Sequence, residues 1–249
     1  MPSLSRAASL QAYRALSGLD FLKLLCGAGK YKQRSEQTHD QVHGPLLADS
    51  PPGEVGCLLL GDSMFERFKT TGKHTKLGQV GFPKLLNAGV GGDKTSNVLY
   101  RLGAKELYAG LKQRGIKLSI LHMGSNDLTP KRGLTAEILD EYGLALETLR
   151  RVSPEVVILV TGIFQRKDVG QGLVDQSNLD LQQLVEDFNN LDQTAKVHYI
   201  PPDSDVTLDK LVDHAHLNEE AYEIFARTLL RKVDELGLMS QLQADGIDT

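Results

Sequence analysis

The feature that most constrains this chain is an alternation of short apolar runs with longer stretches of helical periodicity. The runs have the length of buried strands, and the stretches between them place apolar residues on one helical face. Such alternation is typical of βαβ units, in which crossover helices join parallel strands. The five runs are Val55 to Leu60, Lys84 to Ala88, Leu118 to Met123, Val156 to Thr161 and Val197 to Ile200. The sequence therefore predicts an α/β fold with a five-stranded parallel sheet.

Helices are predicted between the later runs and after the last one. Residues 134–152 and 181–191 each carry an apolar stripe that would face a core. The final helix has the clearest boundaries, with Asn218 as its N-cap and an end at Gly237.

The chain before the first run is an extension to this pattern. Residues 8–25 are amphipathic and predict helix, whereas the polar stretch from Lys30 to the Pro51, Pro52, Gly53 stop predicts a linker. We therefore divide the chain into three parts. These are an N-terminal extension (1–53, partly helical and then a polar linker), a main domain (54–237) and a C-terminal tail (238–249).

Length and charge exclude some classes of protein. A chain of 249 residues suits one sizeable α/β domain. The formal net charge is −4, and the Lys and Arg residues are scattered among carboxylates instead of forming a basic stripe. This pattern argues against nucleic-acid binding.

The location of the protein is predicted from its cysteines and its N-terminus. Only Cys26 and Cys57 occur, so a disulfide framework has no support and a reducing compartment is expected. No apolar stretch reaches the roughly 20 residues that span a bilayer. The first residues do not form a contiguous hydrophobic region followed by small residues, so we do not expect a secretory signal. We expect a cytoplasmic location, with mitochondria as the alternative because Arg6 and Arg14 precede the first acidic residue, Asp20.

Polar and glycine residues directly follow three of the predicted strands, where ligands bind in open parallel sheets. Ser63 follows Gly61 and Asp62 at a strand-to-helix turn, which would place its N–H at a helix N-terminus, favourable for a developing anion. A simple capping turn is the alternative interpretation of this Gly-Asp-Ser triplet.

The next two strand ends add further candidates. The glycines of Asn87-Ala-Gly-Val-Gly-Gly-Asp93 would let backbone N–H groups approach a ligand, and a phosphate loop is the alternative, although neither common phosphate pattern fits. Asn126 could offer its side-chain amide to an oxyanion, or it could close an Asx turn.

Asp213 and His216 lie just before the final helix. An Asp three residues before a His can hold Nδ1–H, so that Nε2 is free to accept a proton from a serine hydroxyl. A serine needs such a base to act as a nucleophile. A structural or surface role is the alternative for either histidine of this loop, and we assign that role to His214.

Taken together and in this order, four short blocks resemble those of the SGNH hydrolases, also called GDSL-type lipases and esterases. The blocks are Gly61-Asp62-Ser63, Asn87-x-Gly-x-Gly-Gly-Asp93, Gly124-x-Asn126-Asp127 and Asp213-x-x-His216. The second block and residues 98–102 after it are most similar to the catalytic subunits of platelet-activating-factor acetylhydrolase. The resemblance spans residues 55–236 and leaves the two ends unaccounted for.

The resemblance implies a three-layer α/β/α flavodoxin-like (SGNH hydrolase) fold with sheet order 2-1-3-4-5. It implies Ser63 as nucleophile, with Asp213 and His216 completing a catalytic triad. The N–H groups of Ser63 and Gly92 and the amide of Asn126 would form the oxyanion hole. Gly92 is preferred to its neighbour because the family uses the glycine directly before the aspartate.

The function expected from these residues is hydrolysis of carboxylic esters through an acyl-enzyme, with a short or acetyl acyl group suggested by the subfamily resemblance. No cofactor or metal is expected, and the expected partner is a small-molecule ester. The oligomeric state is not predicted. Phe65, Leu128 and the segment Phe164 to Gly172 are candidates for substrate contact, although ordinary packing explains the first two equally well. Two alternative functions stay open, namely acyl transfer by the same triad and a non-catalytic flavodoxin-like binding module.

Overall fold

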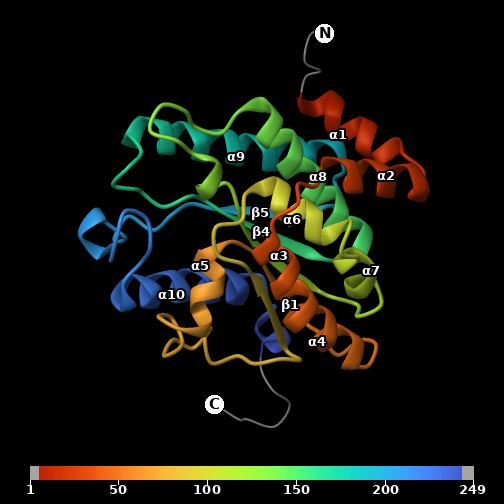
Figure 1. The fold of residues 1–249 in the computed structure, drawn as a ribbon, viewed down its shortest axis with the longest axis horizontal. Coiled ribbons are helices and arrows are strands. Elements are labelled where there is room, and N and C mark those ends of the chain that lie inside the picture. The colour runs from red at the N-terminus through yellow and green to blue at the C-terminus, as the bar shows by residue number, and fades with distance from the viewer. Residues whose placement is uncertain (1–5, 243–249) are drawn as a thin grey trace.

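Five parallel strands form the centre of the molecule in the order β2-β1-β3-β4-β5 (Figure 1), as the resemblance implies. The computed structural model describes residues 6–242 of the chain. The strands are β1 Cys57–Gly61, β2 Leu85–Gly89, β3 Leu118–His122, β4 Val157–Thr161 and β5 Lys196–Ile200. Each lies within two residues of the run that predicted it. The inner strands β1, β3 and β4 are buried at every position, and strands buried on both faces are rich in apolar residues.

Helices cover both faces of the sheet, which makes three layers (Figure 1). One face carries α6 Thr95–Leu102, α7 Leu107–Lys112, α8 Ala136–Val152 and α9 Gln171–Leu191. The other carries α5 Ser63–Glu66 and α10 Glu219–Glu235. Three 3₁₀ turns complete the main domain, namely η2 Arg67–Lys69, η3 Ser125–Asp127 and η4 Leu208–Lys210, and a further one, η5 Met239–Gln241, lies in the C-terminal tail.

The strands divide the interior into two apolar clusters. Successive side chains of a strand point to opposite faces, so Leu58 and Leu60 join the cluster under α6 to α9, whereas Cys57 and Leu59 join the one under α5 and α10. This alternation determines to which face of the sheet each side chain near a strand end points.

The N-terminal extension is helical over most of its length. It consists of α1 Arg6–Ala15, α2 Gly18–Ala28, α3 Gln33–Thr38, the π-helical turn η1 His39–His43 and α4 Gly44–Asp49. The predicted amphipathic stretch is thus two helices, and the second begins where the Ser17 side chain accepts a hydrogen bond from the Asp20 N–H at 3.2 Å.

The polar stretch after Lys30 was predicted to be a linker, and this prediction is wrong because residues 33–49 are helical. Ser35, His39 and His43 of this segment are buried. A helix whose buried face is polar carries no hydrophobic periodicity, so the sequence pattern could not indicate it.

The extension packs on the layer formed by α6 to α9 (Figure 1). Leu10, Phe21, Leu25 and Leu47 are buried in the same apolar cluster as the strands. The Arg151 guanidinium lies 4.0 Å from the centre of the Phe21 ring, a cation–π contact between the extension and α8. The extension therefore shares its core with the sheet.

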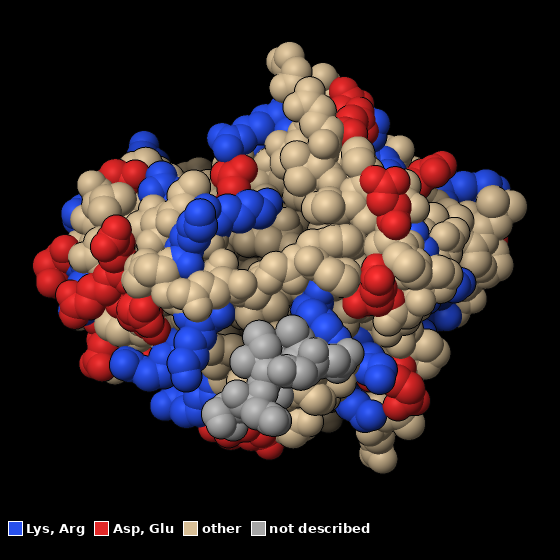
Figure 2. All heavy atoms as spheres, turned by 90° about the horizontal axis from the view of Figure 1, so that it is seen from below, with Lys and Arg blue, Asp and Glu red and all other residues tan. Residues whose placement is uncertain are grey.

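Two features relate to the partners and the location expected from the sequence: the distribution of charge on the surface, and the length and apolarity of the helices. On the face drawn in Figure 2, both basic and acidic side chains are present in small groups, and no continuous field of one sign covers it. Within residues 6–242, none of the helices has the length and apolarity needed to cross a bilayer.

Candidate active site

The loops that follow β1, β2 and β3 begin at the same edge of the sheet, because these three strands are parallel neighbours. Gly61 at the end of β1 is paired with Gly89 of β2 on one side and with His122 of β3 on the other. The loops that carry Ser63, Gly92 and Asn126 consequently start side by side, although they are far apart in the sequence.

The turn after β1 places Ser63 at the start of a helix. A Cβ atom at Gly61 would lie 1.9 Å from the His122 carbonyl oxygen, so only glycine fits there. Asp62 is the N-cap of α5, and its carboxylate accepts the Met64 N–H at 2.9 Å. Ser63 is then the first helical residue, whose N–H has no acceptor within the helix.

The loop before α10 brings His216 to Ser63. An antiparallel bridge between Leu211 and Leu217 closes this loop, and the Val212 N–H donates to the His216 carbonyl at 2.8 Å. His216 Nε2 lies 3.0 Å from Ser63 Oγ, across 153 positions of the sequence. The Ser63 hydroxyl and the His216 imidazole, which were predicted to act together, are therefore within hydrogen-bonding distance.

Asp213 makes three hydrogen bonds within this loop, two of them with His216. Its Oδ2 lies 2.6 Å from His216 Nδ1, and its Oδ1 accepts the backbone N–H groups of Ala215 at 2.9 Å and His216 at 2.8 Å. Burial alone would raise the pKa of Asp213, but the hydrogen bonds from His216 and Ala215 outweigh it and hold that pKa well below its usual range. Asp213 is therefore an anion that orients the imidazole with Nε2 towards Ser63.

His214 lies in the same loop but differs from His216 in the exposure of its side chain and in its distance from Asp213. Its side chain is 56% exposed, and its Nδ1 lies 4.0 Å from Asp213 Oδ1. Its backbone carbonyl accepts the Lys167 N–H at 2.8 Å. This placement is that of a surface residue, which is one of the two roles expected for His214 from the sequence.

Gly92 follows β2 in a conformation suited to an exposed donor. Its φ is +74°, in the left-handed region that favours glycine. Within the part of the chain that the structure describes, its N–H has no hydrogen-bond acceptor. Gly92 is also exposed, whereas Gly91 and Asp93 on either side are buried.

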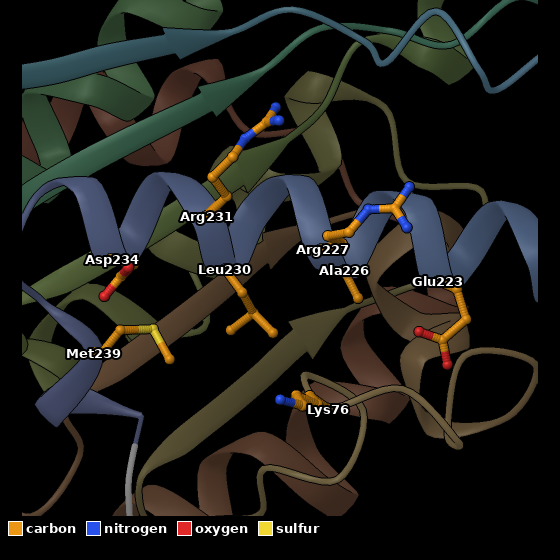
Figure 3. Close-up of a pocket in the computed structure, with 8 residues that line it drawn as sticks. All are labelled: Lys76, Glu223, Ala226, Arg227, Leu230, Arg231, Asp234 and Met239. Carbon is orange, nitrogen blue, oxygen red and sulfur yellow. The ribbon is translucent and has the colours of Figure 1, made fainter.

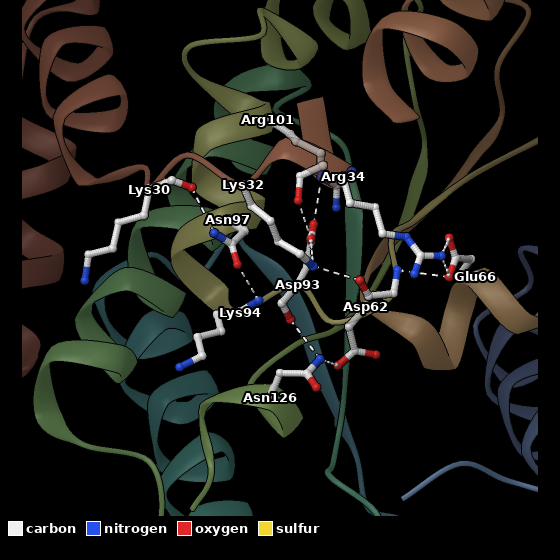
Figure 4. Close-up of polar contacts among 12 residues, drawn as sticks. Lys30, Lys32, Arg34, Asp62, Glu66, Asp93, Lys94, Asn97, Arg101 and Asn126 are labelled. Atoms are coloured by element: carbon white, nitrogen blue, oxygen red, sulfur yellow. Dashed lines mark hydrogen bonds and ion pairs between the residues drawn. The ribbon is translucent and has the colours of Figure 1, made fainter. Parts of the chain in front are cut away.

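Asn126 bridges the loops that follow β1 and β2. Its side-chain nitrogen donates to the Asp93 carbonyl at 3.0 Å and lies 3.3 Å from the Asp62 carboxylate (Figure 4). The first bond orients the amide. The second is long, so it is the one that a ligand oxygen could replace.

Asp62 is an unusual acceptor for this amide, because it is fully buried. Burial raises the pKa of Asp62 to about 7, the Met64 N–H opposes this effect, and the carboxylates of Asp93 and Asp127 add to it. The charge beside Asn126 therefore changes near neutral pH.

The candidates for substrate contact lie in the protein interior. Phe65 is fully buried and stacks on Phe225 with ring centres 6.0 Å apart, and Phe164 meets the same ring edge-on at 4.9 Å. Leu128 is 6% exposed and belongs to the other apolar cluster. These positions favour ordinary packing over substrate contact for all three residues, because their side chains are buried within the two apolar clusters.

The segment after β4 contacts the site through two basic residues that the sequence analysis did not single out. Arg166 Nη1 donates to the Ser125 carbonyl at 2.8 Å, directly before Asn126. Lys167 Nζ donates to the Leu211 carbonyl at 3.0 Å, in the loop that carries His216. Their position after a strand end was the one available signal.

The structure also brings side chains of the N-terminal extension to the loop after β2. Lys32 and Ser35 contact the Asp93 carboxylate, which is shared with Arg101 of α6 (Figure 4). The sequence did not indicate this cluster, because the polar residues 30–51 predicted a linker.

A large cavity lies elsewhere, along α10. It has a volume of about 580 Å³ and is lined by residues that include Lys76, Arg227, Leu230 and Met239 (Figure 3). Neither Ser63 nor its histidine partner is among the residues that line it. Within residues 6–242, no group of three or more His, Cys, Asp or Glu side chains is arranged to hold a metal ion.

Comparison with known proteins places this site in a family. Residues 59–224 match the GDSL-like lipase/acylhydrolase family, and this range contains Ser63, Gly92, Asn126, Asp213 and His216. The chain belongs to the GDSL-like lipase/acylhydrolase family. Family membership confirms the resemblance found in the sequence, and it makes the protein a carboxylic ester hydrolase of this type. No curated protein sequence matches the chain.

Solved structures with the same fold have little sequence in common with this one. A GDSL-like lipase from Bacteroides thetaiotaomicron is 14% identical, with a TM-score of 0.54 over 80% of this chain and 98% of that one. A family 3 carbohydrate esterase from Talaromyces cellulolyticus is 19% identical, with a TM-score of 0.52 over 73% and 97%. A protein from Streptococcus pneumonia named for platelet-activating factor is 18% identical, with a TM-score of 0.53 over 81% and 93%.

Proposed function

We propose that this family member hydrolyses carboxylic esters with Ser63 as nucleophile, His216 as general base and Asp213 as the group that orients the histidine. The observation that carries the proposal is the pair of hydrogen bonds in series, 3.0 Å from Ser63 Oγ to His216 Nε2 and 2.6 Å from His216 Nδ1 to Asp213. Nucleophile, base and orienting carboxylate in such a chain are what acyl transfer from an ester requires.

The proposed reaction proceeds in two halves. Ser63 Oγ forms a bond to the ester carbonyl carbon while His216 Nε2 takes the hydroxyl proton, and the carbonyl oxygen becomes an oxyanion. The ester C–O bond then breaks, and His216 returns the proton to the departing alcohol. Water repeats both steps on the acyl-enzyme, releases the acid and restores the hydroxyl of Ser63.

The oxyanion would be held by the N–H groups of Ser63 and Gly92, together with the Asn126 amide. The support for this assignment is that Ser63 begins a helix and that the Gly92 N–H has no acceptor in the described chain. To serve as the third donor, Asn126 would exchange its 3.3 Å contact with Asp62 for the oxyanion, while the bond to the Asp93 carbonyl stays in place.

A short acyl group, such as acetyl, is the proposed substrate class. The similarity of the second block to the platelet-activating-factor acetylhydrolase subunits supports it. In addition, the carbohydrate esterase and the protein named for platelet-activating factor share this fold.

The test is a chain-length series of p-nitrophenyl esters, from acetate to octanoate, measured on the wild type and on Ser63→Ala. The wild type should favour acetate, and Ser63→Ala should lose about 10⁴-fold or more in kcat on every ester. A fluorophosphonate probe should label the wild type and leave the variant unlabelled. Activity that survives in Ser63→Ala, or a wild type that the probe does not label, would remove Ser63 from the mechanism. Product analysis with an added acceptor alcohol then separates hydrolysis from acyl transfer.

A further inference from the structure

The loop that carries Gly92 is held by side chains from the N-terminal extension (Figure 4). Lys32 Nζ donates to the Gly91 carbonyl at 2.7 Å and to Asp93 Oδ1 at 3.1 Å. Ser35 Oγ donates to the same carboxylate oxygen at 2.5 Å. Both neighbours of Gly92 are therefore bonded to a segment that lies about 60 residues earlier in the chain.

A second pair of residues holds the other backbone group of Gly91. The Gly91 N–H donates to Glu66 Oε2 at 3.0 Å. Arg34 Nη2 in turn donates to both carboxylate oxygens of Glu66, at 2.9 Å each (Figure 4). The N–H and the C=O of Gly91 are thus both engaged, and residues of the extension take part in each case.

The Asp93 carboxylate is shared between the main domain and the extension. Arg101 Nε donates to its Oδ2 at 3.0 Å, while Lys32 and Ser35 donate to its Oδ1. Asp93 and Arg101 are fully buried, whereas the Lys32 side chain is 27% exposed. A buried carboxylate requires such partners, because an unpaired one is strongly destabilising. If Lys32 or Ser35 were removed, Oδ1 of this carboxylate would lose one of its two donors.

Gly92 depends on these contacts more than another residue would. A glycine has no side chain to restrict it, and its φ of +74° is only one of several conformations open to it. A hydrogen-bond donor for an oxyanion must, however, be fixed before the charge develops. In this loop the restriction comes from Gly91 and Asp93 on either side.

We propose that Lys32 and Ser35 are positioning residues for the reaction. They hold the backbone from Gly91 to Asp93 so that the Gly92 N–H points at the developing oxyanion. The N-terminal extension is accordingly a part of the catalytic unit and not an appendage. This inference rests on the proposed function, since it presupposes acyl transfer at Ser63.

The experiment compares four variants of the full chain with the wild type on p-nitrophenyl acetate. Lys32→Met and Ser35→Ala remove donors to the loop, and Lys32→Arg restores a cation. Lys105→Met is the matched control, because Lys105 also pairs with the extension, at Asp40 2.8 Å away, but does not contact the Gly92 loop. Each kcat is divided by the number of sites that a fluorophosphonate probe titrates, and thermal unfolding is recorded for every variant.

We expect Lys32→Met to lose about 10-fold or more in kcat with KM within about twofold, since removing one oxyanion donor outright costs roughly 10²- to 10³-fold. Lys32→Arg should regain most of this loss, and Lys105→Met should stay within about twofold of the wild type. A loss below about fivefold for Lys32→Met, or an equal loss for Lys105→Met, would overturn the inference. If Lys32→Met does not fold, Ser35→Ala decides, with about threefold as the threshold.

Ser63→Ala, measured in parallel, separates the two hypotheses. If that variant keeps its activity, the proposed function has failed. If it is inactive while Lys32→Met resembles the wild type, only the positioning role of the extension is wrong.

Discussion

Each residue of the Gly61-Asp62-Ser63 turn has its own physical reason to be there. Glycine is required because a Cβ atom at position 61 would lie 1.9 Å from the His122 carbonyl oxygen, and aspartate caps the first turn of α5. Serine occupies the first helical position, 3.0 Å from the His216 imidazole. Two of the three residues therefore serve the geometry of the turn, and that geometry sets the position of the hydroxyl.

The two histidines of the loop before α10 allow a paired test at this scale. We expect His216→Ala to lose about 10⁴-fold or more in kcat, because Ser63 would have no base, and we expect His214→Ala to keep most of the activity. The measurement is kcat on p-nitrophenyl acetate for both variants, with thermal unfolding as a check on folding. The reverse result would assign the base to His214.

At the scale of the element, α10 matches its prediction because its ends are set by local interactions. Asn218 Oδ1 accepts the Ala221 N–H at 2.9 Å, and Gly237 after the helix has a φ of +68°. Caps and helical periodicity act over a few residues, and sequence patterns detect such short-range interactions well.

The cap of α10 predicts a stability effect. Asn218→Ala should lower the free energy of unfolding by about 1 kcal/mol, because the Ala221 N–H loses its acceptor. Asn218→Asp keeps an acceptor and should stay close to the wild type. Urea unfolding of the three proteins measures the difference, and equal midpoints for Asn218→Ala and the wild type would show that the cap contributes nothing.

Helices α3 and α4 show where prediction at this scale stops. Their buried residues include Ser35, and the turn between them buries His39 and His43. Polar side chains give no apolar stripe, so their burial depends on partners elsewhere in the chain, such as Asp93. For this reason the sequence indicated a linker where the protein has helices.

At the scale of the whole molecule, the extension also affects stability through a buried histidine. His43 is fully buried, and neither ring nitrogen has a hydrogen-bond partner in the described chain. Burial lowers the pKa of His43 to about 2, and the positive charges of Arg101 and Lys69 add to this effect. In the unfolded chain the pKa of a histidine is roughly 6.5.

Below about pH 6.5, His43 is consequently protonated in the unfolded state but stays neutral in the folded state. The free energy of unfolding therefore falls as the pH falls. Between pH 7 and pH 5 this one group should lower the free energy of unfolding by about 2 kcal/mol. We expect His43→Leu to remove that part of the pH dependence, measured by urea unfolding at both pH values. Parallel pH curves for the two proteins would contradict this account.

The sequence by itself determined the five strands, the final helix, the family and a set of site candidates whose catalytic roles stay a prediction. The strands and the helix follow from short-range periodicity and capping, and the candidates from their positions at strand ends. Only the tertiary structure decided that the extension contacts the Gly92 loop, that Phe65 and Phe164 pack against Phe225, and that His216 reaches Ser63. The physical reason is that such contacts join residues far apart in the chain. No local pattern records which of them meet.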